Sequence, residues 1–368
     1  MSLFSIDASR RLFCRSLGLV LLASVAACTT SNFLPAAQSE TKTAVPIGEQ
    51  VGAGSVVIGL LATEEPNNLS GGASDSTYLA GRQAAQALAK APVTLMIRRY
   101  DGKPASLKKL AADFVQAGAK VIIGPTSGID TAALAKLVAG KGISVISTGR
   151  DADSAQRVFS AGLSISDEVA VSANEIVKRG YGGLIIATLP NETSQIYTSL
   201  LATAVVGAKI PVRLIDIADP VAGIAKYKEI MASDFKPAAI AFSVSPAHAE
   251  AFGKLLRADP AATKLPFIGN SGWSFAPPVS LGEGWYPTLA GNNLAAFGKK
   301  LAGGGPTLLG AVVYDLVTMA GALPQVVKDD PFQAAVITNE QGFKGQTGQF
   351  TFNASGVAER TFVVVPLK

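Results

Sequence analysis

The chain has 368 residues, of which 48% are hydrophobic and 16% charged, and its formal charge is +5 at pH 7. This composition excludes a disordered chain or a coiled coil, and the 37 glycines favour a buried parallel sheet with tight turns. Loss of an N-terminal signal would remove three arginines and one aspartate and so lower the charge to +3. Because no Lys/Arg cluster with interleaved aromatic residues occurs, this small charge predicts no nucleic-acid partner.

Residues 1–27 are typical of a lipoprotein signal peptide. Basic residues precede a 12-residue apolar run, residues 16–27, which is too short to cross a bilayer. The run leads into the sequence VAAC, which resembles the lipobox of bacterial lipoproteins and ends at Cys28. The resemblance implies that Cys28 is the lipid-attachment residue and the first residue of the mature chain. Its acyl chains would anchor the protein to a lipid bilayer.

The export route and the membrane follow from the flanking residues. The segment SRRLFCR, residues 9–15, resembles a twin-arginine motif, but it also fits the basic region of a general secretory signal, so Sec and Tat both stay open. Thr29 is not the aspartate that commonly retains lipoproteins in the inner membrane, which favours the outer membrane, facing the periplasm. Residues 28–55 are polar and turn-rich and predict a flexible tether with a span on the order of 30 Å.

Short apolar runs alternate with helical patterns from residue 56 onward. The runs have no polar face, so they predict strands of a parallel sheet covered on both sides, and hence an α/β fold of two doubly wound sheets. The expected strands of the first series are 56–62, 93–100, 121–123 and 144–147, and its helices are 77–90, 106–117 and 131–139. In the second series the expected strands are 183–188, 212–217, 238–243 and 266–269, with helices 168–178, 193–206, 224–232 and 247–257. A Pro/Gly-rich stretch, 274–291, then leads to helices 293–301 and 306–322 and to strands 348–352 and 361–366.

The chemistry-bearing residues are few. Beyond Cys28 the chain has no cysteine, and His248 is its one histidine. We therefore expect no disulfide, no metal site, no cofactor and no enzymatic activity. Because His248 falls in the first turn of a predicted helix, we interpret it as a surface residue and not as a catalytic base.

Several motifs, in this order, resemble the type I periplasmic-binding fold and, within it, the branched-chain amino acid (Leu/Ile/Val) receptor family. They are YDGKP at 100–104, AGAKVIIGPTSG at 117–128, GISVIST at 142–148, LGAVVYDLVTMAGAL at 309–323 and GFKGQTGQF at 342–350. The resemblance implies two α/β lobes that close on a small solute. We expect lobe 1 to comprise 56–150 plus 290–325, and lobe 2 to comprise 151–280 plus 335–368. Three chain crossings would form the hinge, near residues 150–160, 272–290 and 325–340.

The resemblance also implies a ligand site. In amino-acid-binding members, amides and hydroxyls of two lobe-one loops hold the α-carboxylate of the ligand. The matching residues here are Thr126, Ser127, Ser147 and Thr148, two of them at the start of a helix that would favour an anion. The alternative is that Thr126, Ser127 and Asp130 only cap this helix.

Two positions depart from the family pattern. Members follow the first lobe-two strand with an aromatic-glycine pair and supply an acid for the ligand's ammonium group. Here the sequence is LPNETS, residues 189–194, so Glu192 could take the acid's role although its spacing differs. Arg150 stands where the family has a small or polar residue, and either binds an anionic ligand group or remains solvated.

The resemblance leaves two functions open. The first is a membrane-anchored ABC-transporter-type substrate-binding protein that binds a small polar solute or anion, amino-acid-like, and delivers it to an ABC permease. The second follows from outer-membrane lipoproteins of this fold that regulate penicillin-binding proteins, in which case the partner is a peptidoglycan synthase.

Overall fold

The computed structural model describes residues 48–63, 65–66, 73–88, 90–301 and 305–367. The expected signal peptide, the expected lipid-attachment residue Cys28 and most of the expected tether lie outside these residues. The chain divides into a unit ending at Val45 and a compact unit from Pro46 onward, and everything below concerns the second unit.

The first sheet has six strands in the order β1-β5-β2-β6-β7-β8, and all neighbours except β1 and β5 run parallel. Its central strands are mostly buried, as their largely apolar sequences predict, although Lys120 of β6 is exposed. The strands are β1 (Gly48–Val51), β2 (Val56–Thr63), β5 (Val93–Tyr100), β6 (Ala119–Ile123), β7 (Ser144–Ser147) and β8 (Val158–Ser160).

Helices cover both faces of this sheet. On β2, Gly59 lies against Phe114 of α2 (Pro104–Gln116), while Leu60 lies against Gly81 of α1 (Ser76–Ala87). Because consecutive strand residues point to opposite faces, α1 and α2 cover opposite sides. Helix α3 (Gly128–Val138) shares the apolar cluster of α2, and α9 (Leu308–Val326) packs along α1.

Helix α9 is long and rich in apolar residues. Its 19 residues include a window of mean hydropathy 1.3, which would suffice to cross a membrane by length and composition alone. However, 67% of that window is buried within the fold, where Leu316 and Val317 are fully enclosed. Its apolar sequence is therefore explained by packing in the core of the first sheet.

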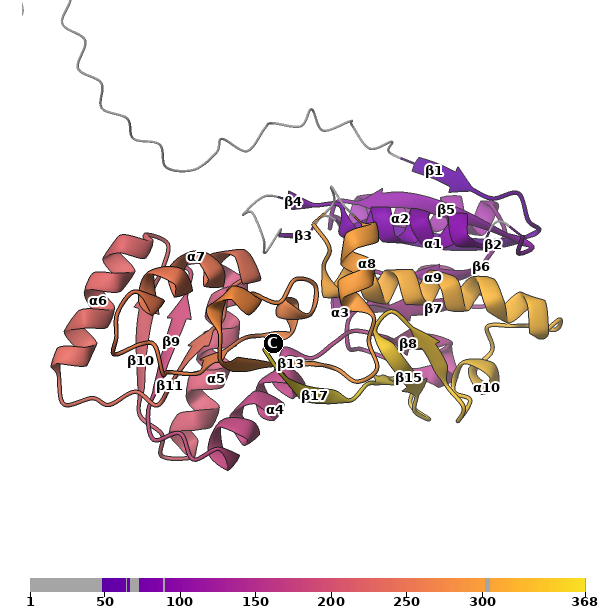
Figure 1. The fold of residues 1–368 in the computed structure, drawn as a ribbon. Helices are drawn as coiled ribbons and strands as arrows, with labels where there is room; N and C mark the ends of the chain where they lie inside the picture. The colour runs from indigo at the N-terminus through magenta and orange to yellow at the C-terminus, as the bar shows by residue number, and fades with distance from the viewer. Residues whose placement is uncertain (1–47, 64, 67–72, 89, 302–304, 368) are drawn as a thin grey trace, which may run out of the picture. The chain divides into compact units, whose positions relative to one another are not determined.

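The second sheet repeats this architecture in the order β10-β9-β11-β12-β13-β17, with β17 antiparallel to β13. On β9, Ile185 and Ala187 face α6 and α7, whereas Leu184 and Ile186 face α4 and α5. Figure 1 shows these helices around the strands. The elements are α4 (Ile165–Lys178), β9 (Leu184–Thr188), α5 (Glu192–Gly207), β10 (Val212–Asp216), α6 (Pro220–Ala232), β11 (Ala239–Phe242), α7 (Pro246–Arg257), β12 (Phe267–Ile268), β13 (Gly284–Leu289) and β17 (Phe362–Pro366). The expected α/β fold with two doubly wound sheets is thereby confirmed.

Short elements connect and flank the two sheets. The strands β14, β15 and β16 form a small antiparallel sheet. The 3-10 turn η1 precedes β8 of the first sheet, and η2 and η3 lie between β12 and β13 of the second sheet. These elements are β3 (Glu65–Pro66), β4 (Ala73–Ser74), η1 (Ser154–Gln156), η2 (Ser271–Ser274), η3 (Val279–Leu281), α8 (Leu294–Lys300), α10 (Ala334–Ile337), β14 (Phe343–Gly345), β15 (Gly348–Phe352) and β16 (Ala358–Glu359).

The strands depart from the expected boundaries at three places. Strand β1 lies within the segment expected to be tether, but it pairs with β5 and forms one edge of the first sheet. Strand β8 joins the first sheet beyond residue 150, the expected end of lobe 1. Of the segment 335–368, only β17 joins the second sheet. The division into two lobes itself stays a proposal.

Candidate functional site

A cavity of about 240 Å³ lies where strands of the second sheet end. Strands β9, β11 and β12 run parallel, so the loops that follow them meet at one edge, as ligand sites of such sheets do. Helix α9 of the first sheet adds its first residues to the wall. The lining is Ile165, Glu168, Leu189, Asn191, Thr193, Ser194, Tyr197, Ser243, Val244, Ser245, Pro246, Asn270, Ser271, Gly272, Phe275, Pro306, Thr307, Leu308 and Leu309.

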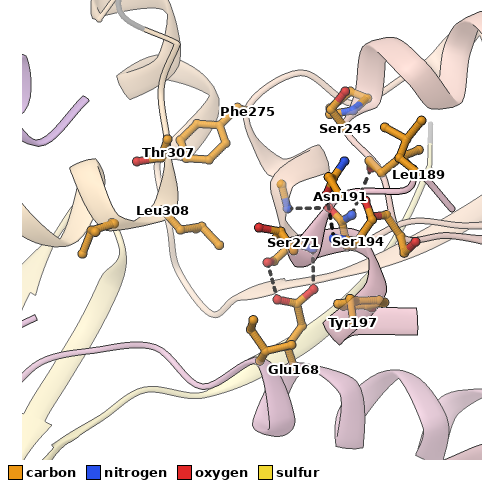
Figure 2. Close-up of a pocket in the computed structure, with 18 of the residues that line it drawn as sticks. Glu168, Leu189, Asn191, Ser194, Tyr197, Ser245, Ser271, Phe275, Thr307 and Leu308 are labelled. Carbon is orange, nitrogen blue, oxygen red and sulfur yellow. Dashed lines mark hydrogen bonds between the residues drawn. The ribbon is translucent and has the colours of Figure 1, made fainter. Parts of the chain in front are cut away.

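Glu168, in the first turn of α4, is the ionisable centre of this cavity. Its side chain is almost fully buried and points at Ser271, as Figure 2 shows. The Ser271 backbone N–H donates to Oε1 at 2.7 Å, and the Ser271 hydroxyl donates to Oε2 at 2.5 Å. Both carboxylate oxygens therefore accept a hydrogen bond from one residue of η2, which fixes the orientation of the carboxyl group.

Burial dominates the electrostatics of Glu168. Loss of water raises its pKa from the usual 4.5 to about 7, although the two Ser271 donors favour the ionised form. Tyr197 of α5 lies beside it, and burial together with the Glu168 charge raises the pKa of this phenol well above 10. Tyr197 thus stays neutral while Glu168 changes protonation near neutral pH.

Local hydrogen bonds hold the walls of the cavity together. Asn191 caps α5 by accepting the Ser194 N–H at 3.0 Å, and the Ser194 hydroxyl donates to the Ser243 carbonyl at 2.9 Å. Asn270, in the loop after β12, connects this loop to the loop after β11, because its side-chain amide donates to the Val244 carbonyl at 3.0 Å. The three loops are therefore joined to each other and form a pre-organised rim.

Two of the expected carboxylate-binding residues line a different cavity. Thr126 and Ser127 border a space of about 780 Å³ at the edge of the first sheet, together with Tyr100, Asp101 and Asp130. The Thr126 hydroxyl lies 2.8 Å from that of Thr148, so the structure brings these two predicted residues together. Leu309 lines both this cavity and the one around Glu168.

Ser127 and Ser147 make bonds within the fold. Ser127 caps α3 by accepting the Asp130 N–H at 3.4 Å, as the capping alternative expects. Ser147 is fully buried, and its hydroxyl donates to the Pro125 carbonyl at 2.9 Å and accepts from the Thr131 hydroxyl at 3.0 Å. Ser147 therefore connects β7 to the segment before α3.

Arg150 and Glu192 lie outside both cavities. The Arg150 guanidinium is half exposed and forms an ion pair with the Asp167 carboxylate at 3.4 Å. Glu192 begins α5 with its side chain in solvent, while its neighbours Asn191 and Thr193 line the cavity.

The sequence interpretation missed Glu168. It assigned Glu168 only to the start of a helix, and nothing in the local pattern distinguished it from the adjacent Asp167. The His248 Nδ1 atom and the Ser245 hydroxyl share a hydrogen bond of 2.8 Å, and His248 is half-buried. Among the described residues, no three His, Cys, Asp or Glu side chains gather as a metal site would require.

Comparison with solved structures identifies the architecture. LivJ, a branched-chain amino acid transporter substrate-binding protein from Streptococcus pneumoniae solved with isoleucine, aligns over 84% of this chain and 95% of its own, with TM-score 0.55 and 16% identity. The chain has the type I periplasmic binding fold. A solute-binding protein of an ABC transporter from R. palustris, solved with benzoate, has the same fold and aligns over 86% of this chain and 94% of its own, with TM-score 0.55 and 18% identity.

LpoA from Haemophilus influenzae also has the type I periplasmic binding fold. It aligns over 84% of this chain but 58% of its own length, with TM-score 0.53 and 16% identity. No protein-family model matches the sequence, and no curated protein matches it. The comparisons therefore establish the fold, and the function is argued from the site.

Proposed function

We propose that the chain is a membrane-anchored extracytoplasmic lipoprotein that reversibly binds a small polar solute, as the substrate-binding protein of an ABC-transporter-type system. The observation that carries this proposal is the cavity around Glu168, at the edge of the second sheet where parallel α/β sheets bind ligands. Burial of a carboxyl group costs free energy unless a strong partner compensates it. A carboxyl group that stays buried without such a partner is therefore a candidate for a functional role.

The composition of the cavity supports binding. Thr307 and Leu308 of α9 line it together with residues of the second sheet, so a solute there would contact both sheets. Trp273 does not occupy it, since this side chain is fully buried against Gly269 and Phe242 in the core. We expect capture and release without bond making or breaking, and therefore no enzymatic activity.

A melting-temperature screen tests the proposal. Purified protein is heated with amino acids, amines and small organic anions, and a bound solute raises the melting temperature with its concentration. Glu168→Gln should reduce this rise if the solute occupies the cavity of the second sheet. The triple variant Thr126→Ala, Ser127→Ala, Thr148→Ala should reduce it if the lobe-one residues hold the ligand. A silent screen with folded protein contradicts solute binding.

A second function is favoured by the lobe-one residues. Thr126 and Thr148 bond to each other, Ser147 is buried and satisfied, and Glu192 lies in solvent, so the ligand set that the resemblance implied does not converge on one point. This arrangement supports an outer-membrane lipoprotein that regulates a penicillin-binding protein without solute transport. Co-purification with a peptidoglycan synthase and stimulation of its activity by the purified protein, unchanged in Glu168→Gln, would support this function.

A further inference from the structure

The charges around the Glu168 cavity are of one sign. Among the described residues that line it, Glu168 is acidic and none is a lysine, arginine or histidine. A carboxylate on the solute would therefore share the cavity with the Glu168 charge and find no cationic side chain to pair with. Two buried carboxylates without a cation repel each other, and one of them must take up a proton.

Glu168 itself lacks a positive partner. Its two oxygens accept from Ser271, which suits an ionised carboxylate, but both donors are neutral. A buried charge with neutral donors is only partly compensated, and a cation that reaches it gains an interaction in a medium of low polarity. An ammonium group at the cavity side of Glu168 supplies that missing charge.

The N-termini of the helices that border the cavity do not supply the missing positive charge. Asn191, Ser245 and Thr307 cap α5, α7 and α9, and each accepts a backbone N–H of its own helix. Pro246, the first residue of α7, has no N–H to offer. The partial positive charge of each of these helix ends is smaller than one formal charge.

The lining of the adjoining cavity also contains more acidic than basic side chains. Asp101 and Asp130 line it. Asp101 forms an ion pair with Lys103 at 3.4 Å, and Arg99, the one cationic side chain among the described lining residues, forms an ion pair with Asp75 at 2.7 Å. Leu309 lies between the two cavities, since it lines both. A solute that extended past Leu309 would thus meet further acidic groups.

The rest of the lining is mostly apolar. Ile165, Leu189, Phe275 and Leu308 face a space of about 240 Å³, which fits a small branched or aromatic group. Figure 2 shows Phe275 and Leu308 on the side of the cavity opposite Leu189. The ligand therefore needs a cationic head and a compact apolar body.

We infer that the solute is a small amine with a compact apolar tail and no carboxylate group, and that its ammonium binds Glu168. The inference rests on the proposed function and specifies the ligand class of that site. It differs from an amino acid by the absence of an anionic group. The ammonium would donate to Glu168 while Ser271 continues to hold the carboxylate from the other side.

Matched ligand sets test this inference by titration calorimetry at pH 8, where Glu168 is ionised. One set is 3-methylbutylamine, leucine and 4-methylpentanoate, and the other is phenethylamine, phenylalanine and 3-phenylpropanoate. In each set the amine should bind about 10-fold or more tightly than the amino acid, and the acid should not bind. An amino acid that binds as tightly as its amine overturns the ligand class and leaves the proposed function standing.

Two variants test whether the ammonium group of the ligand binds Glu168. Glu168→Gln should weaken amine binding by about 10-fold or more, because it removes the charge and keeps the shape. Asp167→Asn removes the neighbouring acid of α4, which is exposed and does not line the cavity, and should leave the affinity unchanged. Equal loss in both variants, or no loss in Glu168→Gln, contradicts the inference.

The broad solute screen separates the two levels of the proposal. If only a neutral or anionic solute raises the melting temperature, the amine inference is wrong and solute binding stands. If amines and all other solutes leave the melting temperature unchanged, solute binding itself is wrong.

Discussion

Glu168 connects the proposed solute site to the stability of the protein. Its pKa is about 7 in the folded chain because of burial, against 4.5 for the free group. Between these values the folded protein holds a proton that the unfolded chain has released. The stabilising contribution is therefore full below about pH 4.5 and is lost as the pH rises through 7, by roughly 3 kcal/mol at most.

We expect Glu168→Gln to remove this pH dependence. The amide stays neutral at every pH, so the free energy of unfolding of the variant relative to the wild type should increase from pH 4.5 to pH 8. Tyr197, the other titratable group beside Glu168, stays neutral throughout this range and does not contribute. Urea unfolding at several pH values measures the difference. A difference that is constant with pH would contradict the assigned pKa.

Asp315 of α9 is a second buried acid, and it organises the turn between β14 and β15. Its carboxylate accepts the Gln346 N–H at 2.6 Å and the Thr347 N–H at 2.9 Å, and the Thr347 hydroxyl donates to it at 2.6 Å. Burial raises its pKa, and these donors oppose the rise. Gly345 passes so close that an added Cβ would lie 2.2 Å from the carboxyl group.

We predict that Gly345→Ala lowers the free energy of unfolding by about 2 kcal/mol, because the methyl group must displace Asp315 or the turn. Gly182→Ala is the matched control, since its Cβ would meet nothing within 4 Å. Chemical denaturation of the two variants should show a large loss in the first and a small change in the second. Similar losses in both would show that the turn adapts freely.

At the scale of elements, most strands could be predicted from the sequence. The boundaries of β5 and β7 match the expected ranges, because each is a short run with an apolar centre between turns. Strand β8 has three residues, which is too short for a pattern. Strand β13 contains Pro287 in a Pro/Gly-rich stretch where the sequence predicted a chain crossing of the hinge. Its pairing with β12 and β17 is a tertiary effect that no local pattern encodes.

The site was less predictable than the fold, for a related reason. Thr126 and Thr148 could be brought together from the order of the motifs, since they follow neighbouring parallel strands. Glu168 could not, because its contact is with Ser271, more than one hundred residues later in the chain. Patterns along a sequence find positions at strand ends, but they do not show which buried side chain from a distant helix completes the cavity.

Strand β1 is the element that the tether prediction did not anticipate. Glu49 attaches it to α1, since the Tyr78 hydroxyl donates to its carboxylate and the Arg82 guanidinium lies at 3.2 Å. The Tyr78 phenol is buried, and burial with the Glu49 bond raises its pKa to about 12. The ordered fold therefore includes residue 48.

We expect Glu49→Ala to lower the free energy of unfolding by about 1–2 kcal/mol, because it leaves the buried Tyr78 hydroxyl without its acceptor. Gln50→Ala, which changes an exposed neighbour on the same strand, is the control and should have little effect. Thermal unfolding of both variants tests whether β1 contributes to the stability of the first sheet. Equal melting temperatures for both variants and the wild type would contradict this role.

At the scale of the whole molecule, the proposed anchor can be tested without the structure. We predict that Cys28→Ser moves the protein from the membrane fraction to the soluble periplasmic fraction and abolishes labelling by radioactive palmitate. Cys14→Ser lies within the proposed signal peptide and should change neither result. Palmitate labelling that persists in Cys28→Ser would place the lipid elsewhere, and separation of inner and outer membranes tests the proposed location.

The position of β17 has a consequence for how the second sheet is completed. This strand, residues 362–366, lies antiparallel against β13, which comes before α8 and the long helix α9 in the chain. A nascent polypeptide that has not yet delivered these residues presents β13, with its buried Trp285, as an open edge able to pair with a foreign strand. Chaperone protection during synthesis or export is thus most needed in the interval between the emergence of β13 and the arrival of residue 366.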